Sequence, residues 1–212
     1  MNLNQINSNN QHPQIKLILL LGSYDEETKN LLNIIKDEIS KISTFFTEIN
    51  VLTLLLEDVE LYIANTNQII IEKYDEKATF ILISGFEIIS IEDYSIKSEE
   101  DINNIIKKLG FKSFIKVPIL EKLKMLAYAT SLIFVIRHLE LTRGGEYIEL
   151  TFLLGKGLNP RKVYMLINKN IEISTMLKEL IDNTKINLRT YKDKTELLDT
   201  IRRITYYEVL KK

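Results

Sequence analysis

The amino-acid sequence predicts an α/β fold, in which a parallel β-sheet carries helices on both of its faces. Short, continuous apolar runs are typical of strands that are buried on both faces, and they alternate along most of this chain with segments whose apolar residues recur at helical spacing. Such alternation indicates crossover connections, which join parallel strands. A chain of 212 residues is also long enough to bury a substantial core around such a sheet.

The first strand and helix lie near the N-terminus. Residues 15–21 (IKLILLL) form a continuous apolar run, and Gly22 supplies a tight turn after it. The segment up to residue 42 then places apolar residues at helical spacing, with acidic residues in its first turn, where the helix dipole favours them. Residues 51–56 (VLTLLL) predict a second buried strand. The polar, Asn- and Gln-rich residues 1–14 predict a disordered tail.

A β-rich insertion is expected at about residues 60–95, after the second strand. Two β-rich runs flank the polar turn YDEK at residues 74–77, which predicts a hairpin, and residues 85–94 (GFEIISIEDY) add a further short strand. We expect residues 15–212 to form a single α/β domain that contains this insertion.

Two helices and three strand–helix units complete the domain. One helix begins at a Ser98 cap and stops at Gly110, and the next has Pro118 in its first turn. Strands and helices then alternate in the order strand 132–136, helix 145–157, strand 162–167, helix 172–183, strand 186–191 and helix 194–210.

Composition excludes several classes of function. The chain has no cysteine and two histidines, so neither a disulfide, a thiolate metal site nor a histidine-rich metal centre is expected. A net charge of −1 makes direct nucleic-acid binding an unfavoured function. Without an apolar run of roughly 18 residues or a signal-peptide pattern, the protein is expected to be cytoplasmic and to have no membrane partner. Abundant Ile, Lys and Glu fits either a heat-adapted source or an AT-rich genome.

Glycines and polar residues mark a candidate ligand site. Ligands of open parallel sheets bind at the carboxyl ends of the strands, where the loops after strands 15–21 and 132–136 are expected to meet. Helix N-termini at this edge expose N–H groups, and glycine allows a phosphate or a ribose to approach the backbone closely. The residues expected to contact a nucleotide-type ligand are Gly22, Ser23, Tyr24, Arg143, Gly144, Gly145 and Glu146. Gly155 and Gly157 are expected to end the helix instead.

Two glutamates follow the glycine pair. Glu146 and Glu149 are three residues apart and so share a helix face. Because Glu149 stands between Ile148 and Leu150, we expect it to be the more buried of the two. Partial burial would raise the pKa of its carboxyl group and suit it to acid/base or nucleophilic chemistry, with Arg143 as a counter-charge. The alternatives are an ion-paired Glu149 and a solvated Glu146.

Two further polar residues directly follow the strand 132–136. Arg137 is expected either to bind phosphate or to pair with Glu140, and His138 to lie at the rim of a pocket.

Residues 123–167, LKMLAYATSLIFVIRHLELTRGGEYIELTFLLGKGLNPRKVYMLI, resemble the nucleoside 2-deoxyribosyltransferase family, and the related TIR and SLOG-type folds share the plan. The opening LILLLGSYDEETKNLLNIIKDEI (residues 17–39) is similar to the family's first strand, ligand loop and helix. The resemblance implies a Rossmann- or flavodoxin-like fold and cleavage of N-glycosidic bonds. It also implies that the glutamate of the Glu-Leu motif, Glu149, attacks the anomeric carbon of the sugar.

Three functions remain open on the sequence. The first is an enzyme that cleaves or transfers the N-glycosidic bond of a nucleoside, a nucleotide or NAD, with Glu149 as the nucleophile and with no cofactor required. The second is a non-catalytic module that senses a nucleotide or acts as a scaffold. The third is an interaction subunit, for example of a defence complex, that forms a homo-oligomer or binds a protein partner through the hairpin at residues 74–77.

Overall fold

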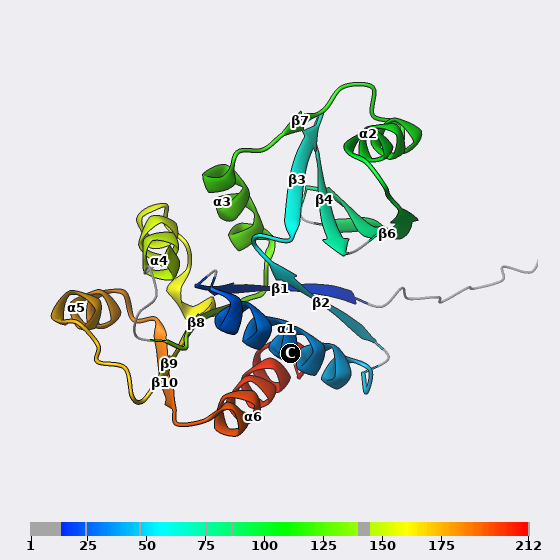
Figure 1. The fold of residues 1–212 in the computed structure, drawn as a ribbon. Coiled ribbons are helices and arrows are strands. Elements are labelled where there is room, and N and C mark those ends of the chain that lie inside the picture. The colour runs from blue at the N-terminus through cyan, green and yellow to red at the C-terminus, as the bar shows by residue number, and fades with distance from the viewer. Residues whose placement is uncertain are drawn as a thin grey trace, which may run out of the picture.

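The computed structural model describes residues 14–23, 25–46, 48–74, 76–85, 87–139 and 145–211. Its centre is a parallel sheet of five strands in the spatial order β2-β1-β8-β9-β10, in which each neighbouring pair runs parallel (Figure 1). The strands are β1 (Gln14–Gly22), β2 (Ile49–Leu55), β8 (Leu132–Arg137), β9 (Val163–Asn168) and β10 (Asn187–Tyr191). Counted along the chain, this order is 2-1-3-4-5, the flavodoxin-like arrangement of a doubly wound fold. The predicted α/β class is therefore confirmed.

Helices cover both faces of the parallel sheet. On one face lie α1 (Glu26–Ser43) and α6 (Lys194–Thr205), which continues into a π-helical turn, η2 (Tyr206–Leu210). On the other face lie α3 (Ile119–Ala129), α4 (Gly145–Gly155) and α5 (Thr175–Thr184). Successive side chains of β1 point to opposite faces of the sheet. Ile18 packs toward α1, and Leu19 packs toward the layer that contains α3, α4 and α5. Both side chains are buried, which explains why the strand is continuously apolar.

A second, antiparallel sheet occupies the segment where a β-rich insertion was expected. It comprises β3 (Val59–Ala64), β4 (Asn67–Tyr74), β5 (Lys77–Ser84), β6 (Glu87–Ser95) and the two-residue β7 (Ile115–Lys116), in the order β6-β5-β4-β3-β7. The strands β4 and β5 pair on either side of the 74–77 turn, as the hairpin prediction requires. The short strand β7 has no counterpart among the predicted elements.

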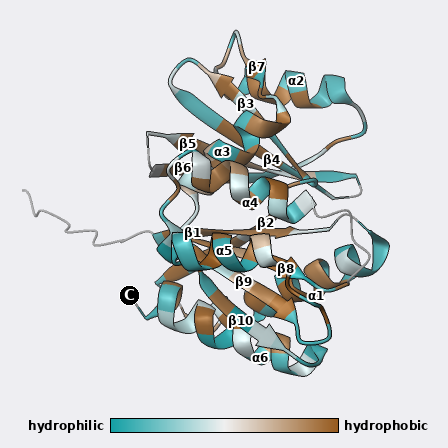
Figure 2. Ribbon diagram, turned by 90° about the vertical axis from the view of Figure 1, so that its left-hand side faces the viewer, coloured by the Kyte–Doolittle hydropathy of each residue, from teal (hydrophilic) through white to brown (hydrophobic). Residues whose placement is uncertain are grey.

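The antiparallel sheet lies between the parallel sheet and α2 (Glu99–Lys108). One of its faces, with Leu61 and Ile70, joins the hydrophobic core above β1. The opposite face, with Ile71, packs under Ile102 and Ile106 of α2. Figure 1 shows α2 as the outermost layer on this side of the molecule, and Figure 2 shows hydrophobic residues along the strands beneath it. The chain leaves the parallel sheet after β2, builds this layer and returns through α3 to β8.

Side-chain caps fix where the helices begin. Asp25 caps α1 by accepting a hydrogen bond from the Thr28 backbone N–H at 2.8 Å. Ser98 and Asp101 form a reciprocal capping box at the start of α2. Pro118 precedes α3 as its N-cap residue, one position before the expected place inside the first turn.

Polar contacts join the two layers. From α1, Lys29 pairs with Glu57 at 2.8 Å in the turn between β2 and β3, and Lys36 pairs with Glu72 of β4. Lys122 of α3 is buried, and its Nζ donates hydrogen bonds to the carbonyl oxygens of Leu56 (2.7 Å) and Val59 (2.6 Å). Lys29 and Lys122 thus satisfy carboxylate and backbone oxygens at the point where the chain leaves the parallel sheet, and Lys36 joins α1 to β4.

Within the described ranges, no helix is long and apolar enough to cross a membrane. The same residues contain no group of three His, Cys, Asp or Glu side chains that could hold a metal ion.

Candidate functional site

The strand order places the two predicted ligand loops side by side. Strands β2 and β8 flank β1, and the connections from β1 and β2 leave toward opposite faces of the sheet, so the point where strand order reverses lies between β1 and β8. We call the carboxyl ends of these two strands the switch edge, made up of the described residues of 22–27 and 137–149. Tyr24, Arg143 and Gly144 were predicted ligand contacts, and they fall outside the described residues.

Gly22 ends β1 under the first turns of α1. A Cβ at this position would lie 3.1 Å from Leu32 Cδ1 and 3.2 Å from Thr28 Cγ2. Close packing of α1 on β1 is therefore sufficient to explain glycine here, and its contact with a ligand stays a prediction. Ser23 is buried beside it. Gly145, the first residue of α4, is packed far more loosely, because a Cβ added there would meet no atom within 4 Å.

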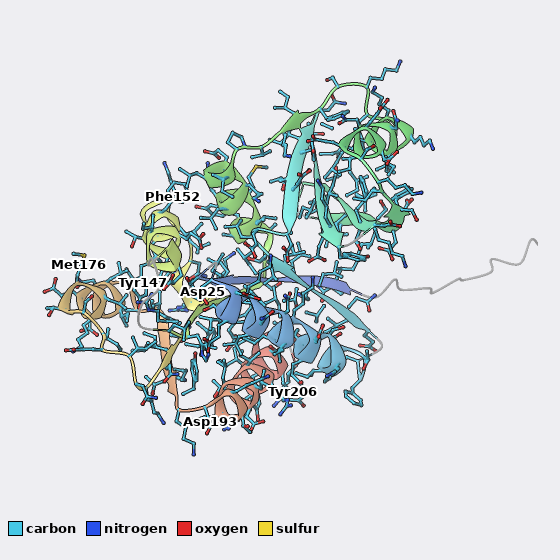
Figure 3. All side chains as sticks on the ribbon, viewed as in Figure 1. Asp25, Tyr147, Phe152, Met176, Asp193 and Tyr206 are labelled. Atoms are coloured by element: carbon cyan, nitrogen blue, oxygen red, sulfur yellow. The ribbon has the colours of Figure 1, made fainter. Side chains whose placement is uncertain are left out.

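The start of α1 is acidic. Burial of the Asp25 carboxyl opposes its ionisation, but hydrogen bonds from Thr28 and Ser23 outweigh burial and lower its pKa. Glu26 and Glu27 follow in the first turn. Three carboxylates thus occupy the helix N-terminus that would otherwise attract an anion. Figure 3 labels Asp25 and Tyr147 at the ends of α1 and α4 that belong to this edge.

Arg137 and Glu146 form a buried ion pair at the junction of β8 and α4. Arg137 Nη1 lies 2.5 Å from Glu146 Oε1, and the Glu146 residue is 0% exposed. The guanidinium carbon also lies 5.0 Å from the centre of the Tyr147 ring, which gives it a cation–π contact. The expectation of a solvated Glu146 is therefore wrong, and Arg137 has Glu146 as a partner rather than only the expected Glu140 or phosphate. Glu140 lies outside the described residues.

The relative burial of the two glutamates is the reverse of the prediction. Glu146 shares the buried stripe of α4 with Leu150 and Leu153, which follow it at helical spacing. Glu149 is only half-buried, although one of its carboxylate oxygens is inaccessible to solvent. Its neighbour Ile148 is 68% exposed. Neighbours in sequence point in different directions on a helix, so the apolar residues on either side of Glu149 did not indicate that Glu149 itself is buried.

Glu149 faces the layer that contains α3. The charge of its carboxylate acts on Lys122 there, whose pKa is lowered mainly by burial and is partly restored by nearby carboxylates, Glu149 among them.

His138 contacts residues of α1 and of β10. Its Nδ1 lies 3.1 Å from the hydroxyl of Tyr191, and its Nε2 lies 3.4 Å from Glu27 Oε1. The rings of His138 and Tyr191 are stacked, with 6.2 Å between their centroids. The Tyr191 hydroxyl also donates a hydrogen bond to the Arg137 carbonyl oxygen at 3.2 Å. His138 therefore bridges the loop after β8 and the first turn of α1.

The comparisons with known proteins are sparse. No family model matches the sequence, and no curated protein matches it. Among solved structures, the flavodiiron core of Flv1 from Synechocystis sp. PCC6803, from a metal-soaked crystal, matches with a TM-score of 0.41 and 10% identity, over 91% of this chain and 34% of that chain. A von Willebrand factor type A protein from Catenulispora acidiphila matches with a TM-score of 0.35 and 8% identity, over 91% of this chain and 42% of that chain. This chain thus spans less than half the length of either, and likenesses this weak say nothing about its function.

The sequence did not reveal all the residues in and around the switch edge. Asp25 was seen only as part of an acidic first turn, although Asp followed three residues later by Thr28 is compatible with an N-cap. Tyr191 was not singled out, and its position at the end of a predicted strand was the available signal. The glycines Gly155 and Gly157 lie at the far end of α4, where Gly157 adopts φ +85° and the Leu158 N–H bonds to the Leu153 carbonyl oxygen, as expected of a helix terminus.

Proposed function

We propose that the switch edge binds a nucleoside, or the nucleoside part of a nucleotide or NAD, and that Glu149 cleaves or transfers its N-glycosidic bond. The observation that carries this proposal is the position of Glu149. It lies one turn inside the helix that begins after β8, beside the reversal point of the sheet, with one carboxylate oxygen buried and with its charge raising the pKa of Lys122. The resemblance to nucleoside 2-deoxyribosyltransferases assigns the nucleophile to the same residue.

The charges of the switch edge favour sugar hydroxyls over phosphate as the recognised group. Asp25, Glu26 and Glu27 surround the start of α1, and the positive charge of Arg137 is neutralised by Glu146. Carboxylates accept hydrogen bonds from hydroxyl groups but repel phosphate. We therefore assign the ribose or deoxyribose to the Ser23–Asp25 side, and place any phosphate of the ligand away from the N-terminus of α1.

The reaction proceeds by two displacements at the anomeric carbon. A carboxylate oxygen of Glu149 forms a bond to that carbon while the bond from the carbon to the base nitrogen breaks, and the base leaves with the electron pair. A purine or pyrimidine takes up a proton from water as it leaves, whereas the nicotinamide of NAD leaves as a neutral molecule. Water, or the nitrogen of a second base, then attacks the same carbon and releases the Glu149 carboxylate. Hydrolysis and transfer differ only in this second attacking group.

Release of free base tests the proposal. The purified protein is incubated with NAD and with a panel of nucleosides and nucleotides, and the products are separated by chromatography. We expect base release by the wild type and its loss in Glu149→Gln. Glu179→Gln, which alters an exposed glutamate of α5, serves as the matched control and should retain activity. Undiminished release by Glu149→Gln would exclude this mechanism.

The second candidate is a non-catalytic nucleoside or nucleotide sensor with the same fold. The buried Arg137–Glu146 pair favours it, because this pair serves structure and leaves Glu149 as the only carboxylate with an exposed surface among the described residues of α4. Calorimetry separates the two functions. Tight binding of a nucleoside without any turnover would select the sensor, and binding of no nucleoside or nucleotide would reject both in favour of an interaction subunit.

A further inference from the structure

A polar cavity lies at the opposite edge of the parallel sheet. It has a volume of about 600 Å³ and is lined mainly by residues at the amino ends of β8, β9 and β10. Ser131 comes directly before β8, Arg161 and Lys162 come before β9, and Lys185 lies before β10. Because the strands are parallel, this cavity is separated from the switch edge by the length of the sheet. Its volume falls in the range of small-molecule sites.

The cavity gathers positive charge in a protein whose net charge is −1. Three of its lining residues, Arg161, Lys162 and Lys185, are cationic, and Glu208 of the π-helical turn η2 is the one anionic residue that lines it. None of the three cations forms an ion pair with a carboxylate in the described part of the chain, although many of the other lysines and arginines do. Unpaired cations that line one cavity are suited to bind an anion.

The backbone that carries Arg161 is held on both sides by asparagine side chains. Asn159 Oδ1 accepts a hydrogen bond from the Arg161 N–H at 3.1 Å, and Asn187 Nδ2 donates to the Arg161 carbonyl oxygen at 3.0 Å. Asn187 Nδ2 also donates to the Val163 carbonyl oxygen at 3.2 Å, which ties the start of β9 to β10. The backbone at Arg161 is therefore held in place by the fold before a ligand arrives.

Lys162 forms part of the wall. Its Nζ donates hydrogen bonds to carbonyl oxygens at the end of α3, including that of Thr130 at 2.9 Å and that of Ala127. Burial lowers the pKa of Lys162 to about 8, so it still carries most of its positive charge at pH 7. On the other side of the cavity, the Tyr164 hydroxyl donates to Glu208 Oε1 at 3.1 Å. The cavity thus offers cations to an anionic group and a carboxylate to a hydroxyl or amino group.

We infer that this cavity binds a small phosphorylated sugar or nucleotide, with the phosphate held by Arg161 and Lys185 and a ligand hydroxyl facing Glu208. Arginine and lysine together are a common pair for phosphate, because the guanidinium forms two parallel hydrogen bonds and the ammonium adds a point charge. This site is independent of the proposed glycosidic chemistry. It gives the protein a place to respond to phosphorylated compounds while the switch edge takes the nucleoside.

Calorimetry with ribose 5-phosphate tests the inference on the full chain. We expect the double variant Arg161→Gln/Lys185→Gln to bind ribose 5-phosphate at least tenfold more weakly than the wild type. Neither side chain forms an ion pair among the described residues, so the variant is expected to fold, which far-ultraviolet circular dichroism checks. Lys112→Gln removes an exposed lysine next to α2 and is the matched control, with binding unchanged.

Three outcomes would overturn the site. They are an absence of ribose 5-phosphate binding at millimolar concentration, equal binding by the wild type and the double variant, and displacement of ribose 5-phosphate by adenosine. Displacement would place the phosphate compound at the switch edge instead. Glu149→Gln alters only the proposed chemistry and Arg161→Gln/Lys185→Gln alters only the cavity, so failure of one proposal is distinguishable from failure of the other.

Discussion

Arg137, the last residue of β8, is joined to Glu146, the second residue of α4, by a buried ion pair with 2.5 Å between Nη1 and Oε1. The pair spans the loop that follows the central strand of the sheet, so it fixes the first turn of α4 against the strand end. Glu149 lies within the next turn and depends on this fixed start for its position.

The buried pair predicts a large and non-additive loss of stability. Arg137→Met or Glu146→Leu alone leaves one buried charge without its partner, and we expect the free energy of unfolding to fall by about 3–5 kcal/mol in each. The double variant should lose less than the sum of the two single losses. Urea unfolding of the four proteins measures this coupling. Additive losses would show that the two side chains do not stabilise each other.

Substitutions at two glycines of the switch edge are expected to differ. Gly22→Ala places a methyl group 3.1 Å from Leu32 Cδ1, and overpacking of this kind lowers the free energy of unfolding by about 1–3 kcal/mol. Gly145→Ala meets no atom within 4 Å and should change stability by less than about 0.5 kcal/mol. Thermal or urea unfolding distinguishes the two. Equal effects would contradict the close packing of α1 on β1.

Glu60 is expected to make the antiparallel layer sensitive to acid. Partial burial opposes ionisation of Glu60, but hydrogen bonds from Lys116, Lys73 and Tyr62 outweigh it and lower its pKa from 4.5 to about 2. A folded-state pKa below the unfolded value stabilises the fold above about pH 4.5, and this contribution is lost as the pH falls toward 2. Urea unfolding between pH 5 and pH 2.5 should therefore show a weaker pH dependence in Glu60→Gln than in the wild type. An unchanged dependence would assign the acid sensitivity to other carboxylates.

The Lys36–Glu72 pair predicts a pH effect of opposite sign. Burial raises the pKa of Glu72, and Lys36 partly opposes this rise. Lys36→Met removes the opposing charge, so we expect the pKa of Glu72 to rise further and the free energy of unfolding to fall by about 1–3 kcal/mol at pH 7. A raised folded-state pKa costs stability as the pH increases, so the loss should be smaller at pH 5. In the double variant Lys36→Met/Glu72→Gln, the loss of unfolding free energy should be the same at pH 7 and at pH 5. If Lys36→Met alone already loses the same amount at both pH values, ionisation of Glu72 is not the cause of the loss.

The sequence was sufficient for the central strands of the parallel sheet because β1, β8 and β9 are buried on both faces. Runs such as residues 15–21 and 132–136 are continuously apolar, which is typical of such strands. The side chain of Ser98, a favoured N-cap residue, indicated where α2 begins. Strand β7 was not predictable, because two exposed residues that pair with Tyr62 and Ile63 leave no periodic pattern.

The site was harder to predict than the fold. Partners such as Glu146 for Arg137 and Tyr191 for His138 depend on which helix face or strand end meets them in space. The buried stripe of Glu146, Leu150 and Leu153 was present in the sequence at helical spacing, and reading that spacing instead of the immediate neighbours of Glu149 gives the correct order of burial. Nothing in the spacing of Arg161 and Lys185 indicated that they line one cavity.

The antiparallel layer between β2 and β8 has a consequence for how the chain folds. Ile18 of β1 pairs with Leu132 of β8, so the central pairing of the parallel sheet joins residues from distant parts of the chain and has to close a long loop. The hairpins of that segment pair only near neighbours and can form early. Once they are in place, they shorten the effective loop that β1 and β8 must close, so the rate at which the central sheet assembles should follow the local stability of the hairpins.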